Sequence, residues 1–244
     1  MECSIVIPAY NEAEYLPDTL DSVRSASAAV FPDGGCEIIV VDNNSTDETA
    51  RIAAEHGAGV RVVFEPVNQI SRARNTGARS AAGRFLLFLD ADTRLSAPLF
   101  ERALSHLRSH QCVGGGVVVA LDRPLTPVAQ WTVNTWNRLS QRQGLAAGCF
   151  IYCLREAWDA VGGFSERVYA GEEIWFSRRL RRWGRGRGLG FRIIADIPIR
   201  TSGRKVEWFT TAQVARRAIP LLLCPWLTRS KRFCDLWYRR PGAH

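Results

Sequence analysis

Hydrophobic residues in the first part of the chain fall into four short continuous runs, separated by stretches in which apolar positions recur at helical spacing. The runs cover residues 4–8, 37–41, 60–64 and 85–89. Runs of this length predict strands that are buried on both faces, and the helical stretches between them predict crossover connections. We therefore predict an α/β fold whose mostly parallel sheet is flanked by helices.

Polar and acidic residues follow three of the predicted strands. Residues 8–12 come after the first strand, Asp42 ends the second, and Asp90 and Asp92 follow the fourth. Because ligands of parallel sheets bind beyond the carboxyl ends of the strands, these residues should share one edge. Two carboxylates at i and i+2 point the same way from an extended chain, and Mg²⁺ or Mn²⁺ binds such oxygens together with substrate phosphates. We predict a divalent-metal site at Asp90 and Asp92, with an ordinary polar turn as the alternative.

The glycines do not form a known phosphate-binding loop. No Gly-x-Gly-x-x-Gly follows the first predicted strand, and the chain has no Walker Gly-Lys-Ser/Thr, so dinucleotide-binding and P-loop folds are disfavoured. Residues 114–116 are three glycines that precede an apolar run, and they predict a bend. A phosphate site in this chain would therefore depend on a metal ion and on Arg side chains, with Arg72 and Arg74 as candidates.

A predicted helix in the second half begins with two acids, Glu172 and Glu173. Phe176 and Leu180 recur at helical spacing and should face the core, and Glu173 starts the same face. Its carboxylate should therefore point inward, toward a cleft. The alternative is that both acids only complement the positive end of the helix dipole.

Composition is that of a globular protein, with 46% hydrophobic and 23% charged residues. We expect no spanning helix and no signal peptide, because the chain lacks a twenty-residue apolar run and a basic start. The seven cysteines are then expected to be reduced thiols in a cytoplasmic protein.

Charge is distributed unevenly along the chain. Residues 178–244 hold 17 of the 32 Lys and Arg and only three acids, a net charge of +14. Within them, 218–227 is an apolar stretch flanked by Arg residues. This pattern predicts that the segment contacts an anionic membrane peripherally, at its inner face. The alternative is a segment that docks on the domain or on a second subunit. We expect no nucleic-acid partner, because no binding motif accompanies the charge.

Four motifs in order resemble those of the family 2 glycosyltransferases of the GT-A fold. Residues 4–12 resemble the opening strand and nucleotide loop of that family, and 40–47 resemble its second strand end. Residues 73–77 resemble its Arg-Asn segment, and 89–92 resemble its Asp-x-Asp metal motif. Any one of these matches alone would be weak.

The resemblance implies a GT-A domain over residues 1–205, with a nucleotide-binding half at 1–112 and an acceptor-binding half at 113–205, followed by a basic amphipathic extension at 206–244. It implies an inverting enzyme that moves a sugar from a nucleotide-diphospho-sugar to the hydroxyl of a lipid, glycan or small molecule, with Mg²⁺ or Mn²⁺ held by Asp92 and Asp90. The residues implied to bind the donor and its metal are Pro8, Ala9, Tyr10, Glu12, Asp42, Asn44, Arg74, Asp90, Ala91, Asp92 and Arg204.

The resemblance also implies a catalytic base. The family usually has Glu-Asp where this chain has Glu172 and Glu173, and the Asp is the base of inverting members. Glu173 stands at that position, with one extra methylene, and Glu172 is a second candidate.

Two other functions remain open from the sequence. A nucleotidyltransferase of related fold could use a similar sheet edge and metal site. A non-catalytic basic protein that binds lipids or anions would explain the +14 segment, but not the carboxylates at successive strand ends.

Overall fold

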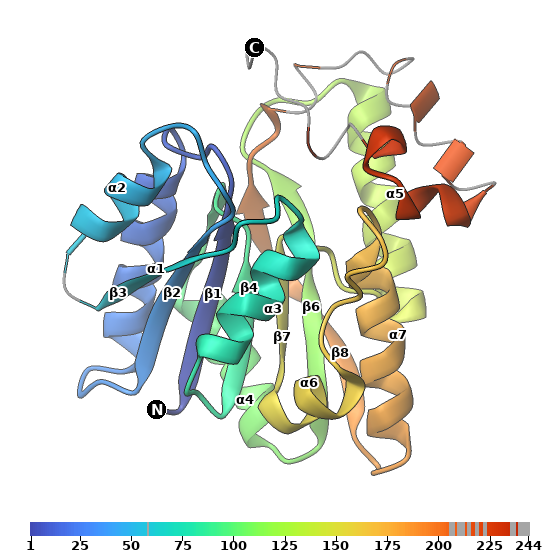
Figure 1. Ribbon diagram of the computed structural model, residues 1–244. Coiled ribbons are helices and arrows are strands. Elements are labelled where there is room, and N and C mark those ends of the chain that lie inside the picture. The colour runs from blue at the N-terminus through green and yellow to red at the C-terminus, as the bar shows by residue number, and fades with distance from the viewer. Residues whose placement is uncertain are drawn as a thin grey trace.

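The computed structural model describes residues 1–57, 59–204, 208, 213, 216–217, 220–221, 224–234 and 238. They form a sheet with helices on both faces (Figure 1). The strands are β1 (Cys3–Ala9), β2 (Cys36–Asp42), β3 (Val60–Phe64), β4 (Phe85–Leu89), β5 (Thr93–Arg94), β6 (Cys112–Leu121), β7 (Phe150–Leu154) and β8 (Gly190–Thr201). The helices are α1 (Leu16–Val30), α2 (Thr49–Glu55), α3 (Ile70–Ser80), α4 (Ala97–Arg108), α5 (Pro127–Gln143), α6 (Arg155–Val161) and α7 (Glu172–Arg185).

The strand order is β3-β2-β1-β4-β7-β6-β8-β5. The four strands that the apolar runs predict, β1 to β4, pair in parallel, with Ile5 opposite both Ile38 and Leu87. Strand β7 is antiparallel to β4 and β6, whereas β6 and β8 are parallel. The predicted α/β architecture with a mostly parallel sheet is therefore confirmed.

The core lies where the continuous apolar runs predict it. Every residue of β1, β4 and β7 is buried, because helices cover both faces of the central sheet. Helices α3, α6 and α7 lie on the face turned to the viewer in Figure 1, and α1 and α4 pack together on the opposite face. Parallel order brings the carboxyl ends of β1 and β4 to one edge.

Gly114–Gly116, where the sequence predicts a bend, lie inside β6, and the irregularity there is a shift in the register with β8 between Cys112 and Gly114. A Cβ atom on Gly115 would lie 1.8 Å from the carbonyl oxygen of Arg192 in β8, and one on Gly116 would lie 2.6 Å from the Cβ atom of Ala146. The glycines therefore serve close packing of β6 against its neighbours rather than a change of chain direction.

The described part of the C-terminal segment packs on the loop before α7. It includes two short 3₁₀ helices, η1 (Pro225–Arg229) and η2 (Lys231–Phe233). The amide of Tyr169 donates a hydrogen bond of 2.6 Å to the carbonyl oxygen of Thr228, and the Tyr169 and Tyr238 rings meet edge to face at 5.8 Å. Most of 206–244, the predicted extension, lies outside the described residues. No helix in the described part of the chain is both long enough and apolar enough to cross a membrane.

Candidate active site

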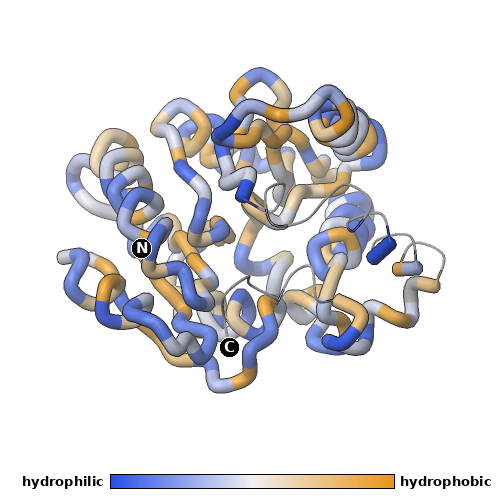
Figure 2. The backbone as a smooth tube through the Cα atoms, turned by 90° about the horizontal axis from the view of Figure 1, so that it is seen from above, coloured by the Kyte–Doolittle hydropathy of each residue, from blue (hydrophilic) through white to orange (hydrophobic). Residues whose placement is uncertain are grey.

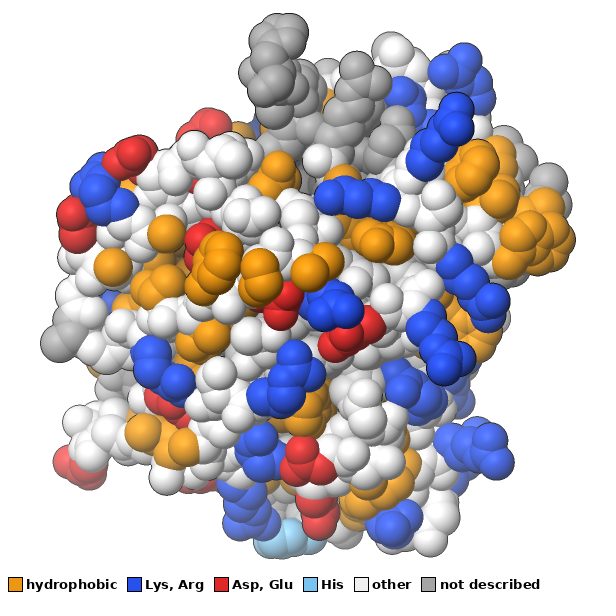
Figure 3. All heavy atoms as spheres, viewed as in Figure 1, with side chains coloured by type: hydrophobic (Ala, Val, Ile, Leu, Met, Phe, Trp, Pro, Cys, Tyr) orange, Lys and Arg blue, Asp and Glu red, His pale blue; other side chains and the backbone are white. Residues whose placement is uncertain are grey.

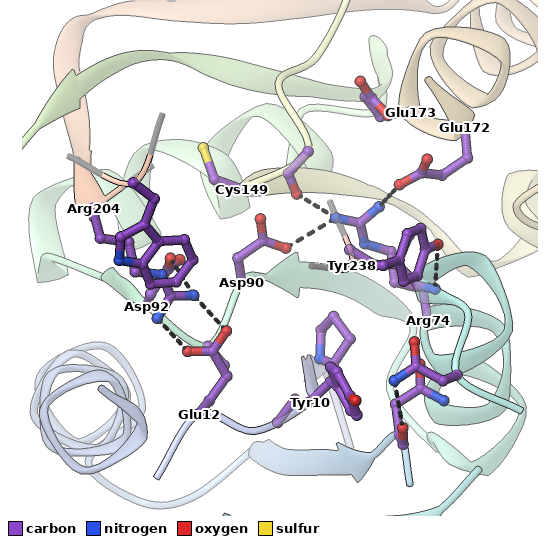
Figure 4. Close-up of a pocket in the computed structure, with 18 residues that line it drawn as sticks. Tyr10, Glu12, Arg74, Asp90, Asp92, Cys149, Glu172, Glu173, Arg204 and Tyr238 are labelled. Atoms are coloured by element: carbon purple, nitrogen blue, oxygen red, sulfur yellow. Dashed lines mark hydrogen bonds and ion pairs between the residues drawn. The ribbon is translucent and has the colours of Figure 1, made fainter. Parts of the chain in front are cut away.

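A cavity of about 230 Å³ lies beyond the carboxyl ends of β1 and β4 (Figure 4). Segments that are far apart in the sequence line it: the loops after β1 and β4, helix α3, the residues before β7, the start of α7 and the residues after β8. Most residues predicted to bind the donor, the metal or the acceptor proton line this one cavity. They are Pro8, Ala9, Tyr10, Glu12, Arg74, Asp90, Ala91, Asp92, Glu172, Glu173 and Arg204.

Arg74 is the centre of a buried network on one side of the cavity. Its side chain is 1% exposed and donates to the Glu172 carboxylate at 2.6 Å and to Asp90 at 2.9 Å. A third bond of 2.8 Å goes to the carbonyl oxygen of Gly148. Burial opposes the charge of Arg74, but the Asp90 and Glu172 carboxylates outweigh burial and hold the pKa of Arg74 above its ordinary value. Arg74 therefore joins the strand β4 end to the first turn of α7.

Arg204 forms the corresponding network on the other side. Its guanidinium donates to both carboxylate oxygens of Glu12, at 2.7 and 2.5 Å, and lies 3.0 Å from the Asp92 carboxylate. The Tyr15 ring packs 4.5 Å from its central carbon. Burial again opposes the charge, but Glu12 and Asp92 hold the pKa of Arg204 above its ordinary value. Each Asp of the predicted metal pair thus faces an arginine.

The two acids that open α7 differ in their surroundings. Gly171 adopts the left-handed conformation, with φ of 74°, immediately before the helix. Glu172 is buried and turns toward Arg74, whereas Glu173 lies beside Gly148 at the edge of the cavity (Figure 4). Burial, with a further contribution from the Glu172 carboxylate, raises the pKa of Glu173 to about 8. The predicted inward direction of Glu173 agrees with its position in the cavity lining.

Two residues predicted to bind the donor do not line the cavity. Asp42 is buried and accepts a hydrogen bond of 3.0 Å from the Ser45 amide, and Asn44 is exposed with φ of 64°. Asn43, between them, lines the cavity instead. Its side chain bonds to the carbonyl oxygens of Glu65 and Val67 and to the Gln69 amide, which fixes the turn after β2. Arg72, the other candidate for phosphate, lies 3.4 Å from Glu166 and is not among the lining residues.

Several lining residues were missed by the sequence analysis: Asn43, Asn68, Ile70, Gly148, Cys149, Trp208 and Tyr238. Ile70 lies one helical turn before Arg74, so the spacing of α3 could have indicated it. The hydroxyl of Tyr238 accepts a bond of 3.4 Å from the Ile70 amide, and burial raises the pKa of Tyr238. No local pattern predicts this contact, because the two residues are 168 positions apart.

The described acidic residues do not form a complete metal site by themselves. Within the described residues, no three His, Cys, Asp or Glu side chains are grouped so that they could hold a metal by themselves. Asp90 and Asp92 supply two carboxylates to one cavity, and hard cations such as Mg²⁺ take one or two carboxylates together with phosphate oxygens. A divalent ion bound here would therefore need phosphate oxygens as further ligands.

Comparison with known proteins identifies relatives across most of the chain. The chain is 27% identical over 213 residues to the glycosyltransferase AglE of Haloferax volcanii, covering 84% of this chain and 69% of AglE. It is 31% identical over 148 residues to an uncharacterised glycosyltransferase of Mycobacterium tuberculosis, covering 56% of this chain and 61% of that protein.

Solved structures of similar fold include three complexes with nucleotides. Mannosyltransferase PcManGT of Pyrobaculum calidifontis with GDP-Man and Mn²⁺ superimposes with a TM-score of 0.67 at 18% identity, covering 88% of this chain and 59% of that one. TarS 1–349 of Staphylococcus aureus with UDP-GlcNAc superimposes with a TM-score of 0.66 at 19% identity, covering 84% of this chain and 59% of the TarS fragment. Glucosyl-3-phosphoglycerate synthase of M. tuberculosis with Mn²⁺, UDP and phosphoglyceric acid superimposes with a TM-score of 0.62 at 21% identity, covering 93% of this chain and 78% of the synthase.

These structures share the GT-A fold that the sequence predicted. This chain spans only about three fifths of the TarS fragment and of PcManGT. Residues 4–155, more than half of the chain, match the family described as Glycosyl transferase family 2. The family match, the curated relatives and the fold agree with the four motifs, and the chain belongs to glycosyl transferase family 2, a family of transferase enzymes.

Proposed function

We propose that this glycosyltransferase moves a sugar from a nucleotide-diphospho-sugar to a hydroxyl acceptor with inversion at the anomeric carbon, and that it requires Mg²⁺ or Mn²⁺. The observation that carries the proposal is the convergence of the Asp90 and Asp92 pair with the Glu172 and Glu173 pair on one cavity. The fold neighbours were solved with UDP-GlcNAc or with GDP-Man and Mn²⁺, which makes these donors the first to test.

In this proposal the residues after β1 and β4 bind the donor. Asp92 and Asp90 would hold the divalent ion, which would supply positive charge against the departing diphosphate. Glu12 fixes Arg204 beside Asp92, so a second positive charge is already oriented where phosphate oxygens would lie. Pro8, Ala9 and Tyr10 also line the cavity, whereas Asp42 does not, so a contact between Asp42 and the donor is not part of this proposal.

Glu173 is the proposed general base. The Arg74 ion pair occupies a carboxylate oxygen of Glu172, which makes Glu172 a positioning residue and Glu173 the better proton acceptor. A base works best when its pKa lies near the working pH, and the raised pKa of Glu173, about 8, meets that condition. Glu173 would take the acceptor proton while the hydroxyl attacks the face of the sugar opposite the diphosphate, so one displacement inverts the anomeric carbon.

The donor proposal is tested first by ligand binding. Melting temperatures are measured with UDP-GlcNAc, GDP-mannose and related donors, with and without Mn²⁺, because a ligand that binds only the folded state raises its stability. Asp92→Asn should abolish the Mn²⁺-dependent shift. Asp21→Asn, in which an exposed carboxylate outside the cavity is changed, should retain it. An equal shift in Asp92→Asn and wild type would contradict the metal assignment.

Turnover with the donor that binds tests the reaction itself. Glu173→Gln should lower the rate by about 10²–10⁴, whereas Glu156→Gln, in the first turn of α6, should not. The expected products are a nucleoside diphosphate and an inverted glycoside. Retention of configuration, or release of pyrophosphate, would contradict the proposed reaction.

We also propose that the protein contacts an anionic membrane peripherally. The support is the +14 charge of residues 178–244 and the exposed Trp226 and Phe233 of η1 and η2. Binding to vesicles tests this proposal separately from turnover.

A further inference from the structure

Helix α5 presents an apolar stripe on the side turned away from the domain. The side chains of α5 that are buried or partly buried are Ala129, Val133, Trp136, Asn137 and Ser140. Of these, Trp136 packs against the core and Asn137 bonds to the backbone of Val119 in β6. On the opposite side Val128 is 54% exposed, Trp131 66% and Leu139 40%. At 100° per residue these three positions fall within one narrow sector of the helix. The stripe is therefore a surface feature of α5 and not part of the core.

The stripe lies in a segment without negative charge. From Arg123 to Arg155 the sequence contains no Asp or Glu. Arg138 and Arg142 are exposed and fall on the same side of α5 as the stripe. Long Arg side chains of this kind can keep their charged ends in water beside apolar residues, and Trp has an apolar ring with one polar group. The face of α5 thus combines apolar anchors with positive charge.

A second aromatic and basic patch lies on the same side of the molecule. Figure 1 places α5 and the segment with η1 and η2 on the side where α7 lies, and Figure 2 shows the molecule from above, with polar and apolar positions alternating along the outer segments. In that segment Trp226 is 64% exposed and Phe233 47%, and Arg229, Lys231 and Arg232 are exposed. Figure 3 shows basic and hydrophobic side chains together along this edge, with the acidic side chains farther from it.

We infer that the outward face of α5, made of Val128, Trp131, Arg138, Leu139 and Arg142, binds the surface of an anionic phospholipid bilayer. Apolar residues flanked by Arg on an interfacial helix bind such surfaces by inserting at the headgroup level and by attracting acidic lipids. Two copies of the chain would bring like charges together, which disfavours this face as a homodimer interface. The inference rests on the membrane contact proposed above and extends it to α5, but it does not depend on the transferase reaction.

The test is flotation of the full chain with two kinds of vesicle, one of phosphatidylcholine alone and one that also contains phosphatidylglycerol. Wild type should bind the anionic vesicles and lose binding as salt is raised. Trp131→Ser with Leu139→Ser should lower the partition coefficient about tenfold or more. Arg138→Gln with Arg142→Gln should lower it about fivefold per charge on anionic vesicles only.

Matched controls change exposed residues on the other edge of the sheet. Phe64 of β3 is 58% exposed, and Phe64→Ser should leave binding unchanged; Arg51→Gln on α2 should do the same. If all variants float like wild type, the α5 inference is wrong while the peripheral contact stands. If wild type does not float, both membrane proposals are wrong.

Two further outcomes would overturn the inference. Equal loss of binding in the Phe64→Ser control would show that the stripe has no special role. If the wild type sediments as a dimer and Trp131→Ser sediments as a monomer, the stripe would be a protein interface. Mn²⁺-dependent nucleotide binding, measured on the same α5 variants, should be unchanged, because these residues are not among those that line the cavity.

Discussion

Arg74 should be one of the most costly residues in this chain to replace. Its side chain is 1% exposed, and it makes two ion pairs and a hydrogen bond to a carbonyl oxygen. Arg74→Met would keep much of the apolar volume but remove the charge. The Glu172 side chain is 5% exposed, so its carboxylate would stay in the interior without a partner.

The size of the effect follows from that burial. Removing one member of a buried ion pair costs about 3–5 kcal/mol, because the remaining charge is not solvated. Asp90 adds little to this figure, since its side chain is 29% exposed and water can replace its partner. Glu172→Gln in the Arg74→Met background should recover part of the loss, by about 1–3 kcal/mol, because it removes the stranded charge.

Urea unfolding at pH 7, followed by far-UV circular dichroism and Trp fluorescence, measures these differences in the free energy of unfolding. Arg79→Met is the matched control, since Arg79 lies on the same helix with a side chain 56% exposed, and it should change stability by less than about 0.5 kcal/mol. If Arg74→Met does not fold, Arg74→Lys tests the same network with the charge retained. A loss in Arg74→Met no larger than in the control would refute the reasoning.

Two further predictions use other parts of the structure. Because Glu173 must be ionised to accept a proton and its pKa is about 8, kcat/KM should rise about tenfold between pH 7 and pH 9, and a profile that is flat or falls there would exclude Glu173 as the base. Gly115→Ala should lower stability by about 1–3 kcal/mol in urea unfolding, because its Cβ atom would lie 1.8 Å from the main-chain oxygen of Arg192. Gly186→Ala, whose Cβ atom would meet its nearest neighbour at 3.6 Å, should change stability by less than about 1 kcal/mol, and equal losses in both variants would contradict the packing argument.

The sheet and one half of the site could be predicted because they depend on local patterns. Continuous apolar runs predict β1 to β4, and parallel order then brings Pro8 and Asp90 to one edge whatever the details of packing. The helical spacing of Phe176 and Leu180 likewise predicted the buried face of α7, although the buried acid of that face is Glu172 and not Glu173. Each of these inferences needs only residues that are close in sequence.

The partners of the acids could not be predicted, because they come from distant parts of the chain. Glu12 was expected to contact the donor, yet its carboxylate holds Arg204, which is 192 positions away. The close packing at Gly114–Gly116 was not predicted, because the atoms that leave no room for a Cβ there belong to β7, β8 and the residues before β7. Such contacts are set by tertiary packing, which periodicity and local motifs do not report.

The charges around the cavity give the proposed metal requirement a physical basis. Among the described lining residues, five carboxylates face two guanidinium groups, a formal charge of −2 when Glu173 is protonated and −3 when it is ionised. A diphosphate adds negative charge to this wall, so it should bind weakly unless a divalent cation enters with it. Because coupling between two ligands is reciprocal, UDP should tighten Mn²⁺ binding by the same factor by which Mn²⁺ tightens UDP binding. Isothermal titration in both orders measures the two factors. UDP affinity that is independent of Mn²⁺ would mean that Arg74 and Arg204 alone neutralise the diphosphate, and the metal role of Asp90 and Asp92 would then have to be abandoned.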